Sequence, residues 1–195
     1  MAIRPILKFP DPGLRLPTHE VSQPFDDDLR ALVTDMIESM YAAAGAGLAA
    51  IQIGSQLRIF VVDGHVAGGA EDAPAVVFIN PQITWLSDET DNGEEGCLSF
   101  PGVFVPVKRA LRAKCRAQDL DGNVFELEGE GLLARAFQHE VDHLNGRLLI
   151  DQVGPVKREL IKRKLRKDAQ AEKEEKEERE EAAARAAAGG KRSAG

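Results

Sequence analysis

The chain has 195 residues, of which 43% are hydrophobic and 29% are charged, which is the composition of a globular protein with its own core. The formal net charge of -7 argues against a surface that binds nucleic-acid phosphates over its whole extent, so we expect no DNA binding. No apolar run approaches the length of a membrane-spanning helix, so we expect no membrane segment.

The first ten residues are extended and rich in proline. They contain neither an uninterrupted apolar segment nor a small-residue cleavage site, so they do not resemble a secretion signal. The two cysteines, Cys97 and Cys115, are too few for a disulfide framework. A reducing compartment is the simpler interpretation, and we expect the protein in the cytoplasm.

A first helix is predicted where apolar residues recur at steps of three and four, from Leu29 to Tyr41. The aspartates at 26–28 would form its acidic first turn, since negative charge is favourable at a helix N-terminus. Gly45 and Gly47 would end it. Small residues continue to Gln52 in a segment where a backbone can approach a ligand closely.

Strands are predicted in the middle of the chain. Apolar and β-branched residues fill 59–62 and 76–79. Over 113–118, small apolar residues alternate with charged and polar ones, which is the period of a half-buried strand. The Asp-Gly pair at 121–122 then predicts a two-residue hairpin turn into a further strand at 124–127.

A second helix is predicted from about Leu132 to Asn145, with Gly146 at its C-terminal side. The order of elements is a helix, several strands and a helix. That order predicts the α+β class, with mostly antiparallel β-sheets around this central helix.

The composition changes beyond Pro155. Lysine and arginine crowd the segment 157–167, and glutamate dominates 168–181. Strong helix formers without proline predict a solvated C-terminal helix that frays into a disordered end. We therefore expect a catalytic domain at residues 1–165 and a charged, Glu/Ala-rich tail at 166–195.

The second predicted helix carries an HExxH motif, formed by His139, Glu140 and His143. A spacing of four places both imidazoles on one helix face, about 6 Å apart, which suits two ligands of one metal ion. The Glu140 carboxylate lies beside the first ligand, where it reaches a water molecule on the ion without binding the ion itself. A chance match on a solvated helix is the competing interpretation.

The third ligand decides the class of metal site. Metzincin proteases have a third histidine where this chain has Leu149, and no histidine follows His143. Glu159, a downstream alternative, lies among lysines and arginines, which is a poor setting for a buried ligand. Cys97 is the strongest candidate, although a free cysteine is usually a small buried residue, which is how we interpret Cys115. A thiolate and two imidazoles leave one coordination position for water.

Three segments of the chain resemble, in order, the three motifs of the peptide deformylase family. Residues 45–52 (GAGLAAIQ) resemble GxGLAAxQ, residues 95–99 (EGCLS) match EGCLS, and residues 138–143 (QHEVDH) resemble QHExDH. The resemblance extends over roughly residues 3 to 165 and includes the spacing between the motifs. It implies a hydrolase that removes the formyl group from N-formyl-methionyl nascent peptides and releases formate.

For the metal site, the resemblance implies that Cys97, His139 and His143 hold one divalent ion and that Glu140 is the general acid/base. Fe²⁺ is the ion expected in the cell, with Zn²⁺ or Ni²⁺ as substitutes, because a Cys-His-His set suits several divalent ions. A zinc endopeptidase is the alternative enzyme. A purely structural metal is the non-enzymatic alternative, and it would need a fourth protein ligand.

For the substrate, the resemblance implies an oxyanion hole made by the Gln52 side-chain amide and the Leu98 backbone N–H. Gly45 and Gly47 would belong to the substrate-binding backbone, which pairs with the peptide as an added strand. The methionine side chain needs an apolar pocket. Its candidate residues, each of which is equally suited to the core, are Ile51, Leu98, Leu133 and Phe137.

The C-terminal segment suggests a partner. In related bacterial deformylases a basic C-terminal helix docks near the exit tunnel of the ribosome, so the basic segment 157–167 predicts ribosome binding. The acidic stretch at 168–181 works against this attraction. A merely solvated helix is the competing interpretation.

Overall fold

The structure, a computed structural model, describes residues 2–190, without the side chains of residue 176 and residues 181–190. The chain forms two units, residues 1–154 and residues 155–195. The elements of the first unit are η1 (Pro12–Arg15), α1 (Asp27–Ala42), β1 (Gly47–Ala49), η2 (Ala50–Ile53), β2 (Ile59–Val62), β3 (Val76–Leu86), β4 (Thr90–Gly96), β5 (Phe104–Ala110), β6 (Arg112–Gln118), β7 (Val124–Glu130), α2 (Leu132–Leu144) and η3 (Leu149–Gln152).

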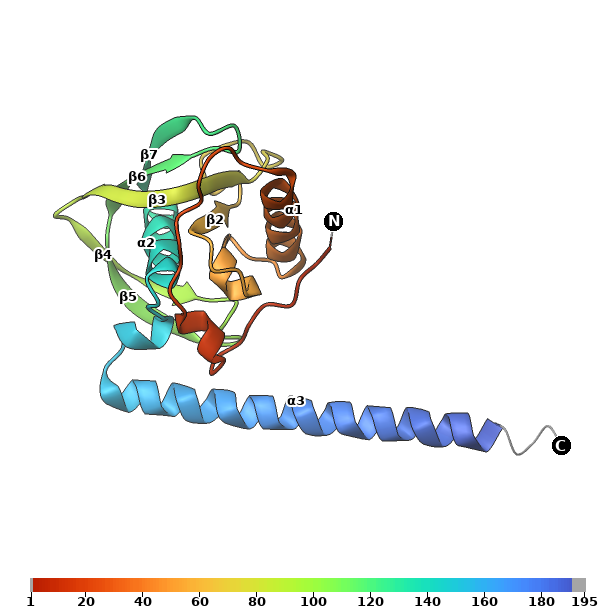
Figure 1. Ribbon diagram of the computed structural model, residues 1–195. Helices are drawn as coiled ribbons and strands as arrows, with labels where there is room; N and C mark the ends of the chain where they lie inside the picture. Colours follow the sequence, from red (N-terminus) through yellow and green to blue (C-terminus); the bar gives the residue numbers. More distant parts are fainter. Residues whose placement is uncertain (1, 191–195) are drawn as a thin grey trace. The chain divides into compact units, whose positions relative to one another are not determined.

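The strands form two antiparallel sheets. Five strands pair in the order β1-β2-β3-β6-β7, and β4 pairs with β5 in a separate two-stranded sheet. The helix α2 contacts strands of both sheets and lies between them, with β6 and β7 above it and β5 below it in Figure 1. The predicted α+β class, with mostly antiparallel sheets around a central helix, is confirmed.

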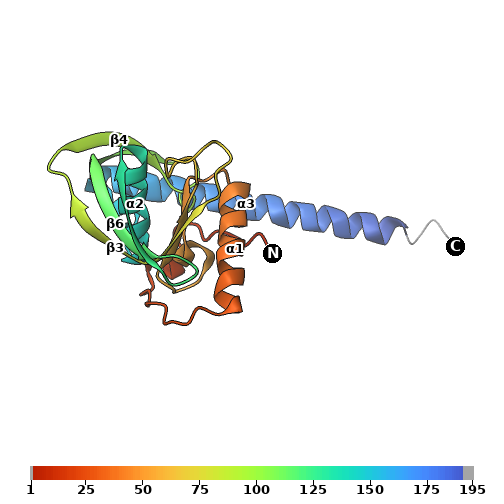
Figure 2. The ribbon, with the colours of Figure 1, turned by 90° about the horizontal axis from the view of Figure 1, so that it is seen from above.

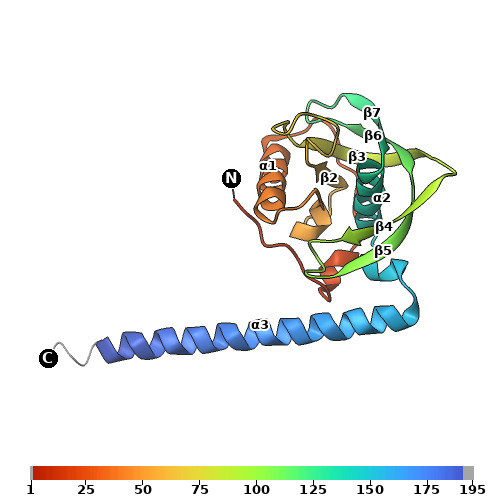
Figure 3. The same ribbon diagram turned by 180° about the vertical axis from the view of Figure 1, so that it is seen from behind.

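The strand β2 is buried on both faces. Successive side chains of a strand point to opposite sides, so Ile59 and Val61 pack in one cluster with α1, and Phe60 and Val62 pack in another with α2. Figures 2 and 3 show the two helices on either side of this part of the sheet. The helix α2 is therefore held from several sides, which fixes the orientation of the residues that it presents.

The first predicted helix is confirmed, with its ends defined by capping. The Asp26 side chain accepts a hydrogen bond from the Leu29 N–H at 2.9 Å, so Asp26 is the N-cap rather than part of the first turn. The helix ends at Ala42. The predicted apolar stripe is largely buried, but its last residue, Tyr41, is 45% exposed.

Several strands differ from the prediction. The strand β3 continues to Leu86, and β1, β4 and β5 were not predicted. Glycine and acidic residues make β4 a poor strand by propensity, and it is a strand because all seven of its residues pair with β5. The predicted two-residue turn is longer, because the Asp119 carboxylate accepts hydrogen bonds from the backbone of Asp121 and Asn123.

The described part of the second unit is the helix α3 (Pro155–Gly190), of 36 residues. Ion pairs at helical spacing join Lys162 to Glu159 and Lys173 to Glu177. The predicted domain boundary between residues 165 and 166 falls within α3 and stays a prediction. The expected disordered end includes residues 191–195, which lie outside the described part. Among the described residues, no helix combines the length and the apolar character needed to cross a bilayer.

Candidate active site

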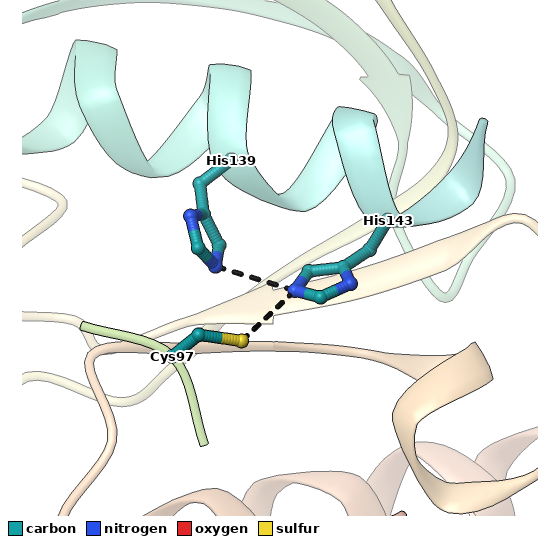
Figure 4. Close-up of side chains that lie close together, drawn as sticks. All are labelled: Cys97, His139 and His143. Carbon is teal, nitrogen blue, oxygen red and sulfur yellow. Dashed lines mark hydrogen bonds between the residues drawn. The ribbon is translucent and has the colours of Figure 1, made fainter. Parts of the chain in front are cut away.

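Three potential metal ligands come together from two segments of the chain. Cys97 directly follows β4, and His139 and His143 lie on one face of α2, with both imidazoles turned toward the thiol (Figure 4). His143 Nε2 lies 3.2 Å from Cys97 Sγ and 3.2 Å from His139 Nε2. All three ligand atoms lie within 4.8 Å of one another. Among the described residues, this is the group of His, Cys, Asp and Glu side chains that could hold a metal ion.

The donor set fits a divalent ion. With metal–nitrogen and metal–sulfur bonds of about 2.1 and 2.3 Å, tetrahedral ligation separates the donor atoms by about 3.4–3.7 Å. The two separations of 3.2 Å from His143 Nε2 are close to this range. A second observation is the Glu140 carboxylate, whose Oε2 is buried without a hydrogen-bond partner among the described residues. An unpaired buried oxygen is costly, so this atom fits a place beside a coordinated water molecule.

The carboxylate of Glu95 orients the first histidine. Glu95 is 4% exposed, and its Oε2 lies 3.0 Å from His139 Nδ1. With Nδ1–H donating to this carboxylate, Nε2 is left to face Cys97 and His143 as a ligand. Burial alone would raise the pKa of Glu95, but hydrogen bonds from His139 and Arg109 outweigh burial and lower the pKa to about 2. The carboxylate is therefore ionised at neutral pH.

Glu140 is buried in the wall of the site, with 4% of its surface exposed. Burial raises the pKa of Glu140 to about 7, while the neighbouring His139 acts in the opposite direction. A carboxyl group with a pKa near neutrality exchanges a proton readily with water and with a leaving amine. The electrostatics of Glu140 therefore suit a general acid/base.

Gln52 is 2% exposed and held in one orientation. Its Oε1 accepts a hydrogen bond from the Ala49 N–H at 2.8 Å, and its Nε2 donates to Ser99 Oγ at 3.1 Å. The same Nε2 lies 3.7 Å from Cys97 Sγ. Because the backbone of β1 fixes the oxygen end of the amide, the N–H end faces the potential metal ligands.

Gly47 lies directly against Glu140. A Cβ atom on Gly47 would be 2.7 Å from Glu140 Oε1, and one on Gly45 would be 2.7 Å from Leu98 Cδ1. These glycines therefore have a packing role in addition to the expected role in the substrate-binding backbone, since any side chain at 47 would displace the carboxylate.

Substitution Gly47→Ala is expected to lower kcat by about 10²-fold, because a displacement of a reacting group by roughly 1 Å has an effect of that size. Metal content should not change, because the three atoms nearest to the added Cβ all belong to Glu140 and none to a metal ligand. Steady-state kinetics and metal analysis on one preparation measure both. Gly154→Ala is the matched control, since nothing lies within 4 Å of a Cβ there. An unchanged kcat in Gly47→Ala would contradict the crowding argument.

A pocket of about 640 Å³ opens onto these residues, a volume in the usual range for small-ligand sites. Of the eight predicted site residues, seven line it, and the eighth, His143, is 1% exposed. The pocket lies between the start of α2, the loop after β4 and the segment before β1. Its apolar lining includes Leu98, Phe100, Val103, Phe104, Leu132 and Ala136.

Three of the four candidates for the methionine pocket are wrong. Ile51, Leu133 and Phe137 belong to the hydrophobic core and do not line the pocket, whereas Leu98 does. The spacing of residues along α2 could have predicted which of them line the pocket. At 100° per residue, the residues three and seven before His139 share its face of α2, and these are the lining residues Ala136 and Leu132.

Comparisons with known proteins give the family. The sequence pattern described as polypeptide deformylase matches residues 3–159. The chain belongs to the polypeptide deformylase family. A peptide deformylase from Acidobacterium capsulatum is 48% identical over 171 residues, 88% of this chain and 98% of the relative. One from Acinetobacter baumannii (strain SDF) is 46% identical over 170 residues, 86% of this chain and 92% of the relative.

Solved structures of deformylases share the fold. A peptide deformylase from Legionella pneumophila is 44% identical, with a TM-score of 0.80 over 88% of this chain and 98% of the other. One from Ehrlichia chaffeensis in complex with actinonin is 37% identical, with a TM-score of 0.79 over 86% and 98%. The chain is therefore a metal-dependent hydrolase of the deformylase type, and the endopeptidase alternative finds no support among these relatives.

Proposed function

We propose that this deformylase acts on N-formyl-methionyl nascent peptides with Cys97, His139 and His143 as metal ligands and Glu140 as the proton carrier. The observation that carries the proposal is the arrangement of the thiol, both imidazoles and the Glu140 carboxylate around one pocket. When bound there, a divalent ion would supply Lewis-acid chemistry and lower the pKa of a water molecule.

Glu140 accepts a proton from the attacking water and later donates it to the amine that leaves with the rest of the peptide. In the metal-free protein burial raises the pKa of Glu140 to about 7, and its place beside the ligands allows this carboxyl group to carry the proton. Gln52 Nε2 and the Leu98 N–H donate hydrogen bonds to the formyl oxygen as negative charge develops on it, and each donor contributes about 3 kcal/mol. Gly45 and Gly47 bring backbone close to the peptide.

The methionine side chain enters the apolar part of the pocket, beside Leu98, Leu132 and Ala136. A related deformylase from Acinetobacter baumannii, 36% identical with a TM-score of 0.71, has been solved bound to Met-Ala-Ser, which supports a methionyl peptide as the substrate class. Turnover of formyl-Met-Ala-Ser, followed by release of formate, tests the function. No turnover with any metal loaded would contradict it.

We propose Fe²⁺ as the ion in the cell, with Zn²⁺ or Ni²⁺ as substitutes, because a thiolate with two imidazoles suits all three ions. Ferrous iron beside the thiolate of Cys97 at an open site is prone to oxidation. Activity of the iron form should therefore decay in air and be protected by catalase, while the zinc form remains active. Metal analysis after anaerobic purification identifies the native ion, and equal lifetimes of the two forms in air would contradict this account.

We also propose that the protein acts in the cytoplasm and contacts the ribosome through the basic segment 157–167 of α3. Attraction to RNA phosphates is mostly electrostatic and weakens steeply with salt. Truncation after Val156 should leave turnover of formyl-Met peptides intact and weaken co-sedimentation with ribosomes at low salt. Unchanged co-sedimentation would exclude this docking, and lost turnover would show that the helix is part of the catalytic fold.

A further inference from the structure

We propose that Arg109 is a positioning residue of this enzyme, because it fixes the two metal-binding segments relative to one another. Arg109 lies on β5, is 9% exposed and does not line the pocket, so it acts through other side chains. The inference rests on the proposed metal site. It goes beyond that site by naming the group that sets the distance between the thiol and the imidazoles.

The guanidinium of Arg109 joins the two segments directly. Its Nε and Nη2 donate to Glu95 Oε1 and Oε2 at 2.8 and 3.1 Å, and its Nη1 donates to Asp142 Oδ2 at 2.6 Å. Glu95 precedes Cys97 by two residues at the end of β4, and Asp142 directly precedes His143 on α2. One planar group therefore spans the strand that leads to the thiol and the helix that carries the imidazoles.

The connection continues to a ligand itself. Glu95 Oε2, which accepts from Arg109, also lies 3.0 Å from His139 Nδ1. A rotation of this carboxylate would turn the imidazole or break the hydrogen bond that selects its tautomer. The two-pronged contact from Arg109 prevents that rotation, because both carboxylate oxygens are held at once. A lysine supplies the charge but not the rigid fork.

The remaining contacts show what would change without Arg109. Glu95 would keep the hydrogen bond from Arg135 Nη1 at 2.8 Å, so the buried carboxylate would still face a cation. Asp142 would keep a hydrogen bond from Gln152 Nε2 at 3.0 Å. Loss of Arg109 is therefore expected to loosen the arrangement of the ligands. It would not leave the carboxylates of Glu95 and Asp142 without a hydrogen-bond donor.

The test uses the full chain loaded with Co²⁺, whose absorption bands report the thiolate bond and the coordination geometry. In Arg109→Met, release of cobalt to a chelator should be about 10–100-fold faster than in the parent, as for other residues that orient metal ligands, and the bands should shift. Arg109→Lys should show the same changes. Arg4→Met is the matched control, because it breaks an ion pair with a buried carboxylate, that of Asp35 on α1, a helix that carries none of the proposed ligands.

Each outcome decides the proposal. Cobalt release and spectra that equal the parent's in Arg109→Met, even with lower thermal stability, would show a merely structural ion pair. Parent-like release in Arg109→Lys would show that charge rather than position matters, and would also overturn the proposal. If Arg109→Met does not fold, Arg109→Lys decides by the same two measurements. A parent chain that binds no cobalt would instead overturn the proposed metal site, and this inference with it.

Discussion

Glu140→Gln is expected to keep its metal ion and lose about 10³-fold or more of kcat, which is within the range that proton transfer by one side chain contributes. The substitution preserves size and leaves Cys97, His139 and His143 untouched. It removes the only feature that the mechanism needs from Glu140, an oxygen that takes up and releases a proton. Turnover of a formyl-Met peptide and metal content per chain, measured on the same sample, test both halves of the expectation.

A second carboxylate serves as the control for Glu140. Glu94 also lines the pocket but is exposed, so Glu94→Gln should retain most of the activity. Full activity in Glu140→Gln would remove this residue from the chemistry. Loss of the ion in that variant would show that the carboxylate supports metal binding instead.

Cys97→Ala is expected to abolish both the bound metal and the activity. Two imidazoles alone hold a divalent ion weakly, and the thiolate is the charged member of the set. Metal content after dialysis against a weak chelator should fall to about one tenth of the parent value or less. Loss of a ligand lowers metal affinity more than the 10–100-fold effect of groups that only orient the ligands.

Cys115→Ala is the matched control for Cys97→Ala. Cys115 is fully buried, and burial raises the pKa of its thiol to about 12, so it is neither a ligand nor a reactive group. The variant should bind metal like the parent. Metal and turnover that survive in Cys97→Ala would require another third ligand and would overturn the proposed metal site.

The sequence alone was sufficient to predict the metal ligands, because the spacing of the two histidines determines that they lie on one helix face. In a helix, residues four apart share a face, so His139 and His143 had to lie together wherever α2 packed. Cys97 emerged by comparison with the few other candidate ligands, and the structure brings its thiol to the same point. The class of fold followed equally from the order of elements.

The surroundings of the ligands could not be predicted in the same way. Arg109 lies 14 residues from Glu95 and 33 from Asp142, so their contacts depend on how β4 and β5 pair and on where α2 packs against them. The composition of β4 gave no strand signal. Without that strand, neither the contact of Glu95 with His139 nor the contact of Arg109 with Glu95 could be inferred.

The two-stranded sheet has a consequence for the life of the enzyme in the cell. Two strands on their own are marginally stable, and β4 leads directly into Cys97. A bound ion ties this hairpin to α2, so binding energy also opposes local unfolding of the hairpin. Molecules that lose the ion should open there first and expose 90–110 to proteolysis. Quality control would then remove inactive copies selectively, without a separate signal for the missing cofactor.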